Sequence, residues 1–139
     1  YQMGSLKREE LIATNSMILH EAYFACLGRA GSQPGTALAQ QIESDFGAMD
    51  KWRAEFVAMG KALGGGSGWV LLNWSPRMGR LTNQWAGDHT MTLADGRVLV
   101  ALDMYEHAYH MDFGAKAAAY VDAYMNALSW TTADKVFAG

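Results

Sequence analysis

The sequence predicts an α+β fold in which helices are followed by a small three-stranded antiparallel sheet and a C-terminal helix. Apolar residues recur at helical spacing over residues 6–63, whereas residues 69–103 contain short apolar runs separated by turn residues. Residues 113–130 then return to a helix-forming pattern. Helices and strands that are segregated along a chain in this way are typical of α+β domains.

The helical region is expected to contain two breaks. Residues 6–29 form the first helical stretch, which the Gly- and Pro-rich run GRAGSQPGT ends. From 36 to 63, apolar steps of three and four indicate one or two amphipathic helices, with a joint near residues 47–50. The glycines at 64–68 are followed by Trp69 and not by the lysine of a phosphate-binding loop, so we interpret them as a helix stop.

Three short segments are typical of strands. WVLLNW (69–74) and RLTNQW (80–85) are separated by the turn residues SPRMG, a pattern that predicts a β-hairpin. RVLVALD (97–103) predicts a third strand, and the alanine-rich segment 113–130 predicts the closing helix.

Composition excludes several classes of protein. The chain has 139 residues, of which 50% are hydrophobic and 18% charged, so it is long enough for one folded domain with a sizeable core. Its net charge of −3 gives no basic surface for nucleic acid. There is no apolar stretch of membrane-spanning length and no signal-peptide pattern, and the single cysteine, Cys26, suits a reducing compartment. We therefore expect a cytoplasmic domain that binds neither membranes nor nucleic acid.

The segment LDMYEHAYHMDF (102–113) places acids and histidines next to an apolar strand. Asp103 and His107 are four residues apart, so on a helix they would share one face and could bind one ion. Alternatively, Asp103 caps a helix and His107 bonds a carbonyl group. His20 lies within an apolar helix, where it is either a core residue or a ligand. Together, two histidines and one carboxylate suggest a mononuclear metal site.

Four segments, in order and spacing, resemble the iron/manganese superoxide dismutase family. TNSMILHEAYF resembles its second helix, FGAMDKWRAEFVAMGKALGGGSGWVLL the stretch leading into its sheet, LDMYEHAYHMDF its metal-binding signature and YVDAYMNALSW its last helix. The resemblance covers about residues 6–130. It implies an enzyme that disproportionates superoxide at one Fe or Mn ion per subunit, and a fold like the C-terminal domain of that family.

The resemblance also implies roles for individual residues. Three of the family's four protein ligands match His20, Asp103 and His107. Gln84 matches the glutamine that, in manganese-type enzymes, hydrogen-bonds the metal-bound solvent, whereas iron-type enzymes bring this glutamine from the position of Ser16. Trp69 matches an aromatic residue in the wall of the family's site, and Tyr105 stands at the tryptophan position of the signature. Glu106 and Tyr109 match two residues of the family's homodimer interface.

The match begins at the family's second helix. The resemblance therefore implies that residues 1–30 are part of an N-terminal helical domain and that 31–139 are the C-terminal α+β domain. No residue before Ser5 supplies the family's first metal histidine, so we expect the chain as given to bind metal poorly, unless His89 or His110 substitutes. The sequence leaves iron and manganese undistinguished. Two alternatives stay open, which are a non-catalytic dimerisation or scaffold protein and a non-haem iron oxygenase.

Overall fold

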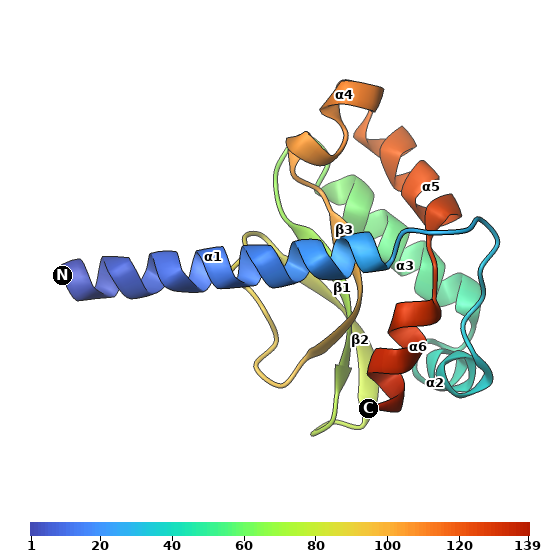
Figure 1. Cartoon of the computed structure of the whole chain (residues 1–139). Helices are drawn as coiled ribbons and strands as arrows, with labels where there is room; N and C mark the ends of the chain where they lie inside the picture. Colours follow the sequence, from blue (N-terminus) through green and yellow to red (C-terminus); the bar gives the residue numbers. More distant parts are fainter.

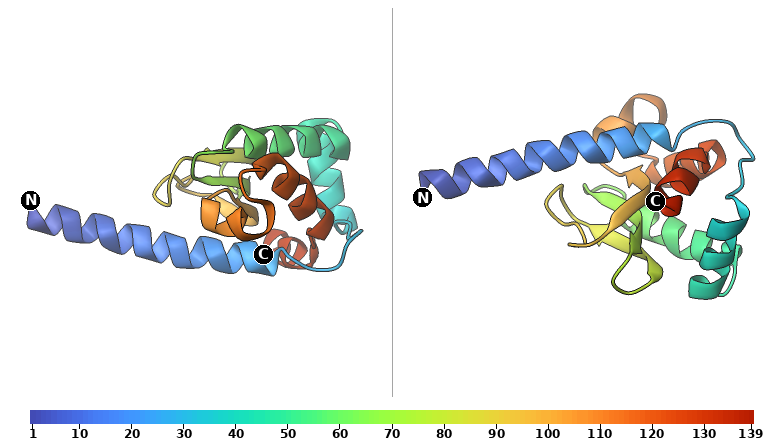
Figure 2. Two further views of the ribbon diagram at one scale, coloured as in Figure 1. Left: turned by 90° about the horizontal axis from the view of Figure 1, so that it is seen from above. Right: turned by 60° about the horizontal axis from the view of Figure 1, so that its bottom comes forward.

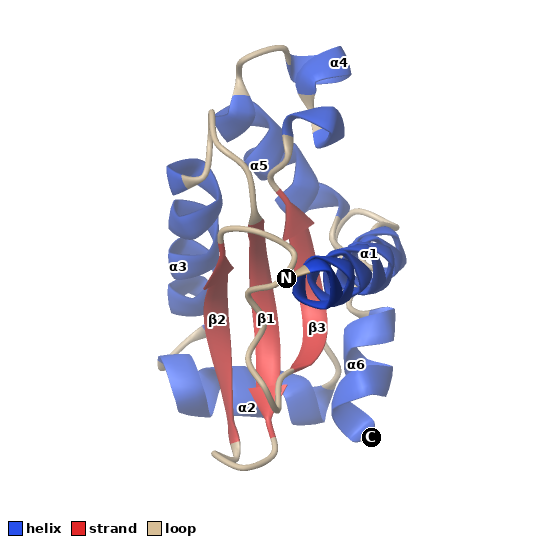
Figure 3. Cartoon of the chain, turned by 90° about the vertical axis from the view of Figure 1, so that its left-hand side faces the viewer, coloured by secondary structure: helices blue, strands red, loops and turns tan.

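A three-stranded antiparallel sheet lies at the centre of the computed structural model, which describes residues 1–139 (Figures 1 and 3). The strands are β1 (Trp69–Ser75), β2 (Arg80–Ala86) and β3 (Arg97–Asp103), in the order β2-β1-β3. The β1–β2 hairpin predicted from the sequence is present, with Trp69 opposite Ala86. Trp69 also lies opposite Asp103 on β3, so the end of β3 is held at the start of β1.

Helices precede and follow the sheet, as the α+β prediction requires. The predicted joint in the second helical stretch is confirmed, because Gly47 has a φ of 90° and its N–H bonds the Glu43 carbonyl at 2.8 Å. Only glycine adopts such a φ without strain, and this makes it a common helix terminator. The helices are α1 (Gln2–Ala25), α2 (Thr36–Phe46), α3 (Met49–Ala62), the 3-10 turn η1 (Glu106–Ala108), α4 (His110–Phe113), α5 (Ala117–Ala127) and α6 (Thr131–Ala138).

Helix α1 passes beside β3, and its N-terminal half projects away from the rest of the molecule (Figures 1 and 2). Leu19 and Tyr23 are buried on the side that faces the sheet, whereas Leu11, Ile18 and Phe24 are exposed on α1. The helix has 24 residues, yet neither it nor any other helix is apolar enough over a sufficient length to cross a membrane.

The predicted closing helix, residues 113–130, is shorter in the structure, and a further helix that was not predicted follows it. Helix α5 ends at Ala127, and α6 begins at Thr131. Between them, the Ser129 N–H bonds the Cys26 carbonyl at 2.7 Å, and the Ala127 carbonyl accepts from Gly28 N–H at 2.9 Å. Because the Ala127 carbonyl and the Ser129 N–H bond the segment after α1, they are not available to continue α5.

The outer edge of β3 is closed by side chains. β3 pairs only with β1, so the carbonyl groups at alternate positions have no strand partner on the other side. Three of these carbonyls accept hydrogen bonds from helix α5 and from the residue that follows α1: Asp103 from Tyr120 (2.7 Å), Ala101 from Tyr124 (2.6 Å) and Leu99 from the Cys26 thiol (3.5 Å). These bonds fix the strand that carries Asp103 against the helices on either side.

Candidate metal centre

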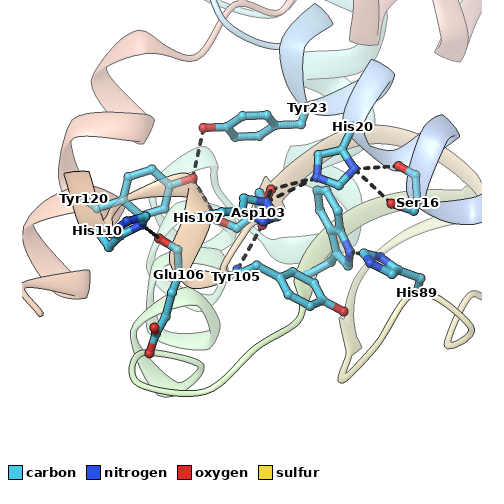
Figure 4. A network of polar contacts seen from close by, with 11 residues as sticks. Ser16, His20, Tyr23, His89, Asp103, Tyr105, Glu106, His107, His110 and Tyr120 are labelled. Atoms are coloured by element: carbon cyan, nitrogen blue, oxygen red, sulfur yellow. Dashed lines mark hydrogen bonds and ion pairs between the residues drawn. The ribbon is translucent and has the colours of Figure 1, made fainter. Parts of the chain in front are cut away.

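Three side chains from separate elements converge at the carboxyl end of β3 (Figure 4). His20 comes from α1, Asp103 is the last residue of β3, and His107 belongs to η1. The Oδ2 atom of Asp103 lies 3.2 Å from His20 Nε2 and 2.8 Å from His107 Nε2, and the two Nε2 atoms are 3.3 Å apart. The three candidate ligands expected from the sequence thus lie together.

These spacings fit a single metal ion. With metal–ligand bonds of about 2.1 Å, two donor atoms are separated by about 3.0 Å at right angles and by about 3.6 Å at 120°. The three observed separations, 2.8, 3.2 and 3.3 Å, lie at or close to this range. Imidazole nitrogens and a carboxylate oxygen form a ligand set that suits iron or manganese.

The backbone of α1 fixes the orientation of the His20 ring. Its Nδ1 atom lies 2.7 Å from the Ser16 carbonyl oxygen, one helical turn earlier. A carbonyl oxygen only accepts, so Nδ1 carries the proton and the neutral ring presents a lone pair at Nε2. This is the tautomer that a metal-binding histidine requires when Nε2 is the ligand atom. The Ser16 hydroxyl lies 3.3 Å from the same Nδ1 atom.

Asp103 and His107 do not share a helical face, which corrects the geometry expected from their spacing. Asp103 ends a strand, and His107 lies in a 3-10 turn. The Asp103 Oδ1 atom accepts the backbone N–H of Tyr105 at 2.9 Å, and this bond turns the chain so that His107 faces Oδ2. Such a bond from an aspartate to the backbone two residues on is typical of turns. The alternative that Asp103 caps a helix is not observed.

The cluster is buried at one side and open at the other. Asp103 is 1% exposed, whereas the side chains of His20 and His107 are 28% and 56% exposed. A nearly buried carboxylate needs compensating partners, which the two imidazoles or a cation bound by all three supply. The exposed His107 side gives small solutes a route to the cluster.

The aromatic rings of Trp69 and Tyr105 lie beside the cluster. The fully buried Trp69 ring meets His20 edge-on, with centroids 4.9 Å apart. Tyr105 lies between two imidazoles, stacked on His89 at 4.8 Å and on His107 at 5.7 Å. Burial raises the pKa of the Tyr105 hydroxyl, and the carboxylates of Asp88 and Asp103 add to this effect, so the phenol stays protonated at neutral pH.

His89, considered from the sequence as a substitute ligand, lies beside these rings and is not part of the ligand cluster. Its Nδ1 accepts the indole N–H of Trp69 at 2.9 Å, and its ring centroid is 6.1 Å from that of His20. An indole nitrogen can only donate, so the neutral His89 ring carries its proton at Nε2. Burial lowers the pKa of His89, and the neighbouring His20 lowers it further, which favours this neutral form.

Gln84, by contrast, makes all its hydrogen bonds away from the ligand cluster. Its Nε2 donates to the Met91 carbonyl at 2.7 Å, and its Oε1 accepts from the Leu93 N–H at 3.1 Å and from Asn73 Nδ2. The glutamine therefore faces the β2–β3 connection. It makes no hydrogen bond to His20, Asp103 or His107, and the role expected for it at metal-bound solvent stays a prediction.

The two residues expected at an interface differ in exposure. Glu106 is exposed, and its carboxylate has no hydrogen-bond partner within the chain. Tyr109 is only 3% exposed and stacks on Tyr120 at 5.3 Å, but it lines a recess of about 220 Å³ beside Glu106. His110, also in this recess, bonds the Glu106 carbonyl through Nδ1 at 3.0 Å and does not join the ligand cluster.

Comparison with known proteins identifies similar sequences over this whole region. Residues 34–136 match the family model described as "Iron/manganese superoxide dismutases, C-terminal domain". The chain is 66% identical over 138 residues to a protein of Cupriavidus metallidurans named superoxide dismutase [Fe]. That match covers 99% of this chain and 70% of the relative.

More distant relatives carry names with either metal. A protein of Halobacterium salinarum named superoxide dismutase [Mn] 1 is 36% identical over 81% of this chain. One of Methanothermobacter thermautotrophicus named superoxide dismutase [Fe] is 33% identical over 86% of it. The chain spans 56% and 60% of the lengths of these two relatives.

Proposed function

Because the chain belongs to the iron/manganese superoxide dismutase family, we propose that it dismutates superoxide at a mononuclear iron or manganese centre held by His20, Asp103 and His107. The observation that carries the proposal is the convergence of one carboxylate oxygen and two Nε2 atoms, with separations of 2.8 to 3.3 Å. A scaffold protein would have no need of this arrangement. A non-haem iron oxygenase would use the same ligand types, but the similar proteins are named superoxide dismutases.

The residues around the ligands have distinct tasks in this proposal. When bound, the metal ion would exchange single electrons between its +2 and +3 states, so that two superoxide ions and two protons become dioxygen and hydrogen peroxide. Asp103 offsets positive charge from within the protein, and the Ser16 carbonyl keeps His20 in its ligand tautomer. The rings of Trp69 and Tyr105 restrict water to the open side at His107.

We assign the hydrogen-bond donor near the substrate to His89 and not to Gln84. The bond from Trp69 leaves the His89 proton at Nε2, and the ring lies next to His20 and Tyr105. A neutral imidazole donates a hydrogen bond from Nε2 without changing its charge, so His89 would orient bound solvent or superoxide while the two protons come from solvent.

The surroundings of His107 support the proposal of a homodimer. Metal-binding histidines usually donate their second N–H to a carboxylate or carbonyl, but Nδ1 of His107 has no partner within the chain. Glu106 is an exposed carboxylate on the same turn, so in a two-fold pair it could reach the partner's histidine. We expect Glu106→Ala to weaken dimerisation in sedimentation measurements while the unfolding of each subunit changes little. A wild-type chain that is monomeric at micromolar concentration would contradict this assignment.

Metal content tests the centre directly. We expect His20→Ala, Asp103→Ala and His107→Ala each to abolish iron or manganese binding and superoxide dismutation, because each removes one of three ligands. His110→Ala is the matched control, since it removes an exposed imidazole outside the cluster. Full metal occupancy in His107→Ala would overturn the ligand assignment. The same assay on a version extended upstream by a histidine-bearing helix tests whether a fourth protein ligand is required.

A further inference from the structure

The β2–β3 connection presents His89 to the site through a loop that is tied down on both sides of it. We call residues 87–93 the His89 loop. Within it, the Asp88 carboxylate accepts from the Thr90 N–H at 2.7 Å and from the Thr90 hydroxyl at 2.6 Å, which closes a tight turn around His89. From α1, Asn15 Nδ2 donates to the His89 carbonyl at 2.7 Å. These bonds fix the backbone at His89 itself.

Gln84 holds the other half of the same loop. Its amide spans two loop residues, because Nε2 donates to the Met91 carbonyl and Oε1 accepts the Leu93 N–H. Asn73 on β1, which is 1% exposed, donates to the same Oε1 and keeps the amide from rotating. These three partners allow the Gln84 amide only one orientation. With its oxygen and nitrogen exchanged, the oxygen would face the Met91 carbonyl and the nitrogen would face two N–H donors.

From these contacts we propose that Gln84 is a positioning residue of the metal centre, which acts on it only through the His89 loop. The inference rests on the proposed dismutase function and gives Gln84 a role different from contact with metal-bound solvent. Trp69 can donate to His89 Nδ1 only while the loop keeps the ring in place. Loss of the Gln84 anchor therefore frees the ring, and with it the direction in which Nε2 donates.

A double-mutant cycle separates this role from a merely structural one. If Gln84 acts through His89, Gln84→Leu lowers the rate of dismutation by about tenfold in the wild-type background. In the His89→Ala background the same change has no further effect, since the group being positioned is gone. Gln41→Leu is the matched control, because Gln41 is also half-buried but bonds Asp45 on α2, away from the site.

A second readout needs no activity. In the metal-free full chain, hydrogen exchange of the Trp69 indole N–H, assigned by its loss in Trp69→Phe, reports the bond to His89 directly. We expect Gln84→Leu and, independently, Asn15→Ala to accelerate this exchange about tenfold, and Gln41→Leu to leave it unchanged. Asn15 is a half-buried residue of α1 outside the hydrophobic core, and its side chain bonds only the His89 carbonyl, so Asn15→Ala serves if Gln84→Leu fails to fold.

The two readouts have separate meanings. An inactive wild-type chain whose indole exchange still responds to Gln84→Leu would refute the proposed function but support the anchoring of His89 by Gln84. Unchanged exchange in both anchor variants would refute the inference whatever the activity. Equal losses of rate in the wild-type and His89→Ala backgrounds would also refute it, because Gln84 would then act independently of His89.

Discussion

Tyr120 should contribute more to stability than any other tyrosine hydroxyl of the chain, and Tyr120→Phe tests this. Its hydroxyl donates to the Asp103 carbonyl at 2.7 Å and lies 3.1 Å from the Tyr23 hydroxyl. Phenylalanine keeps the ring and its packing but leaves the buried carbonyl without its donor and the Tyr23 hydroxyl without its neighbour. Burial raises the pKa of Tyr120 far above its ordinary value, so the hydroxyl is protonated at every pH at which the protein is folded.

The expected magnitude follows from the number of groups left unsatisfied. Each costs about 1–3 kcal/mol when buried, so leaving the Asp103 carbonyl without its donor and the Tyr23 hydroxyl without its acceptor should cost about 2–6 kcal/mol. Tyr124→Phe leaves only the Ala101 carbonyl unsatisfied and should cost about 1–3 kcal/mol. Tyr105→Phe removes a hydroxyl that has no partner within the chain and should stay within about 0.5 kcal/mol of wild type.

Urea unfolding of the metal-free protein, followed by circular dichroism, measures all three variants. With a slope of about 2 kcal/mol per molar urea, Tyr120→Phe lowers the midpoint by about 1–3 M without changing the slope. The order of destabilisation should be Tyr120→Phe, then Tyr124→Phe, then Tyr105→Phe. If Tyr120→Phe lies within about 0.5 kcal/mol of Tyr105→Phe, the hydrogen bonds at the end of β3 do not stabilise the fold as argued.

Three further predictions concern the turns and the metal. Gly68→Ala should prevent stable folding, because Gly68 has a φ of 142° and an added Cβ would lie 2.4 Å from the Ala86 carbonyl oxygen; a soluble variant with a wild-type melting temperature would contradict this. The Ser75 hydroxyl bond is the main cause that lowers the pKa of Asp95, so in NMR titration Ser75→Ala should raise that pKa. Since the folded-state pKa is depressed, this stabilisation is present above about pH 4 and is lost as pH falls through the lower value, and Ser75→Ala should reduce the loss. Adding Mn²⁺ or Fe²⁺ should raise the melting temperature of the wild type but not of His107→Ala, because only a formed site couples binding to folding.

Local signals in the sequence were enough to predict most of the fold. The hairpin follows from two apolar runs around a five-residue turn, and the joint between α2 and α3 follows from Gly47, whose left-handed conformation ends a helix. The break after Ala127 could not be predicted, because nothing near Ser129 differs from a helix. It arises from hydrogen bonds with residues 26–28, a hundred positions away.

In the candidate site, too, local signals identified some features, and long-range contacts determined the others. His20, Asp103 and His107 could be singled out by residue type and by family resemblance, but the turn that brings His107 to Asp103 depends on one backbone bond at Tyr105. The position of His89 depends on contacts with three other elements. A local signal was present nonetheless, because Asp88 and the threonine two residues later are typical of a turn that would expose the residue between them.

The closed outer edge of β3 has a consequence for behaviour at high concentration. An uncovered edge strand offers its carbonyls to any extended chain, and this is a common start of aggregation. Here two tyrosines and a cysteine occupy the carbonyls of three alternate residues, so a foreign strand would have to displace the side chains that also fix Asp103. The same bonds that hold the candidate ligand in place thus also keep a strand of another copy from pairing with β3.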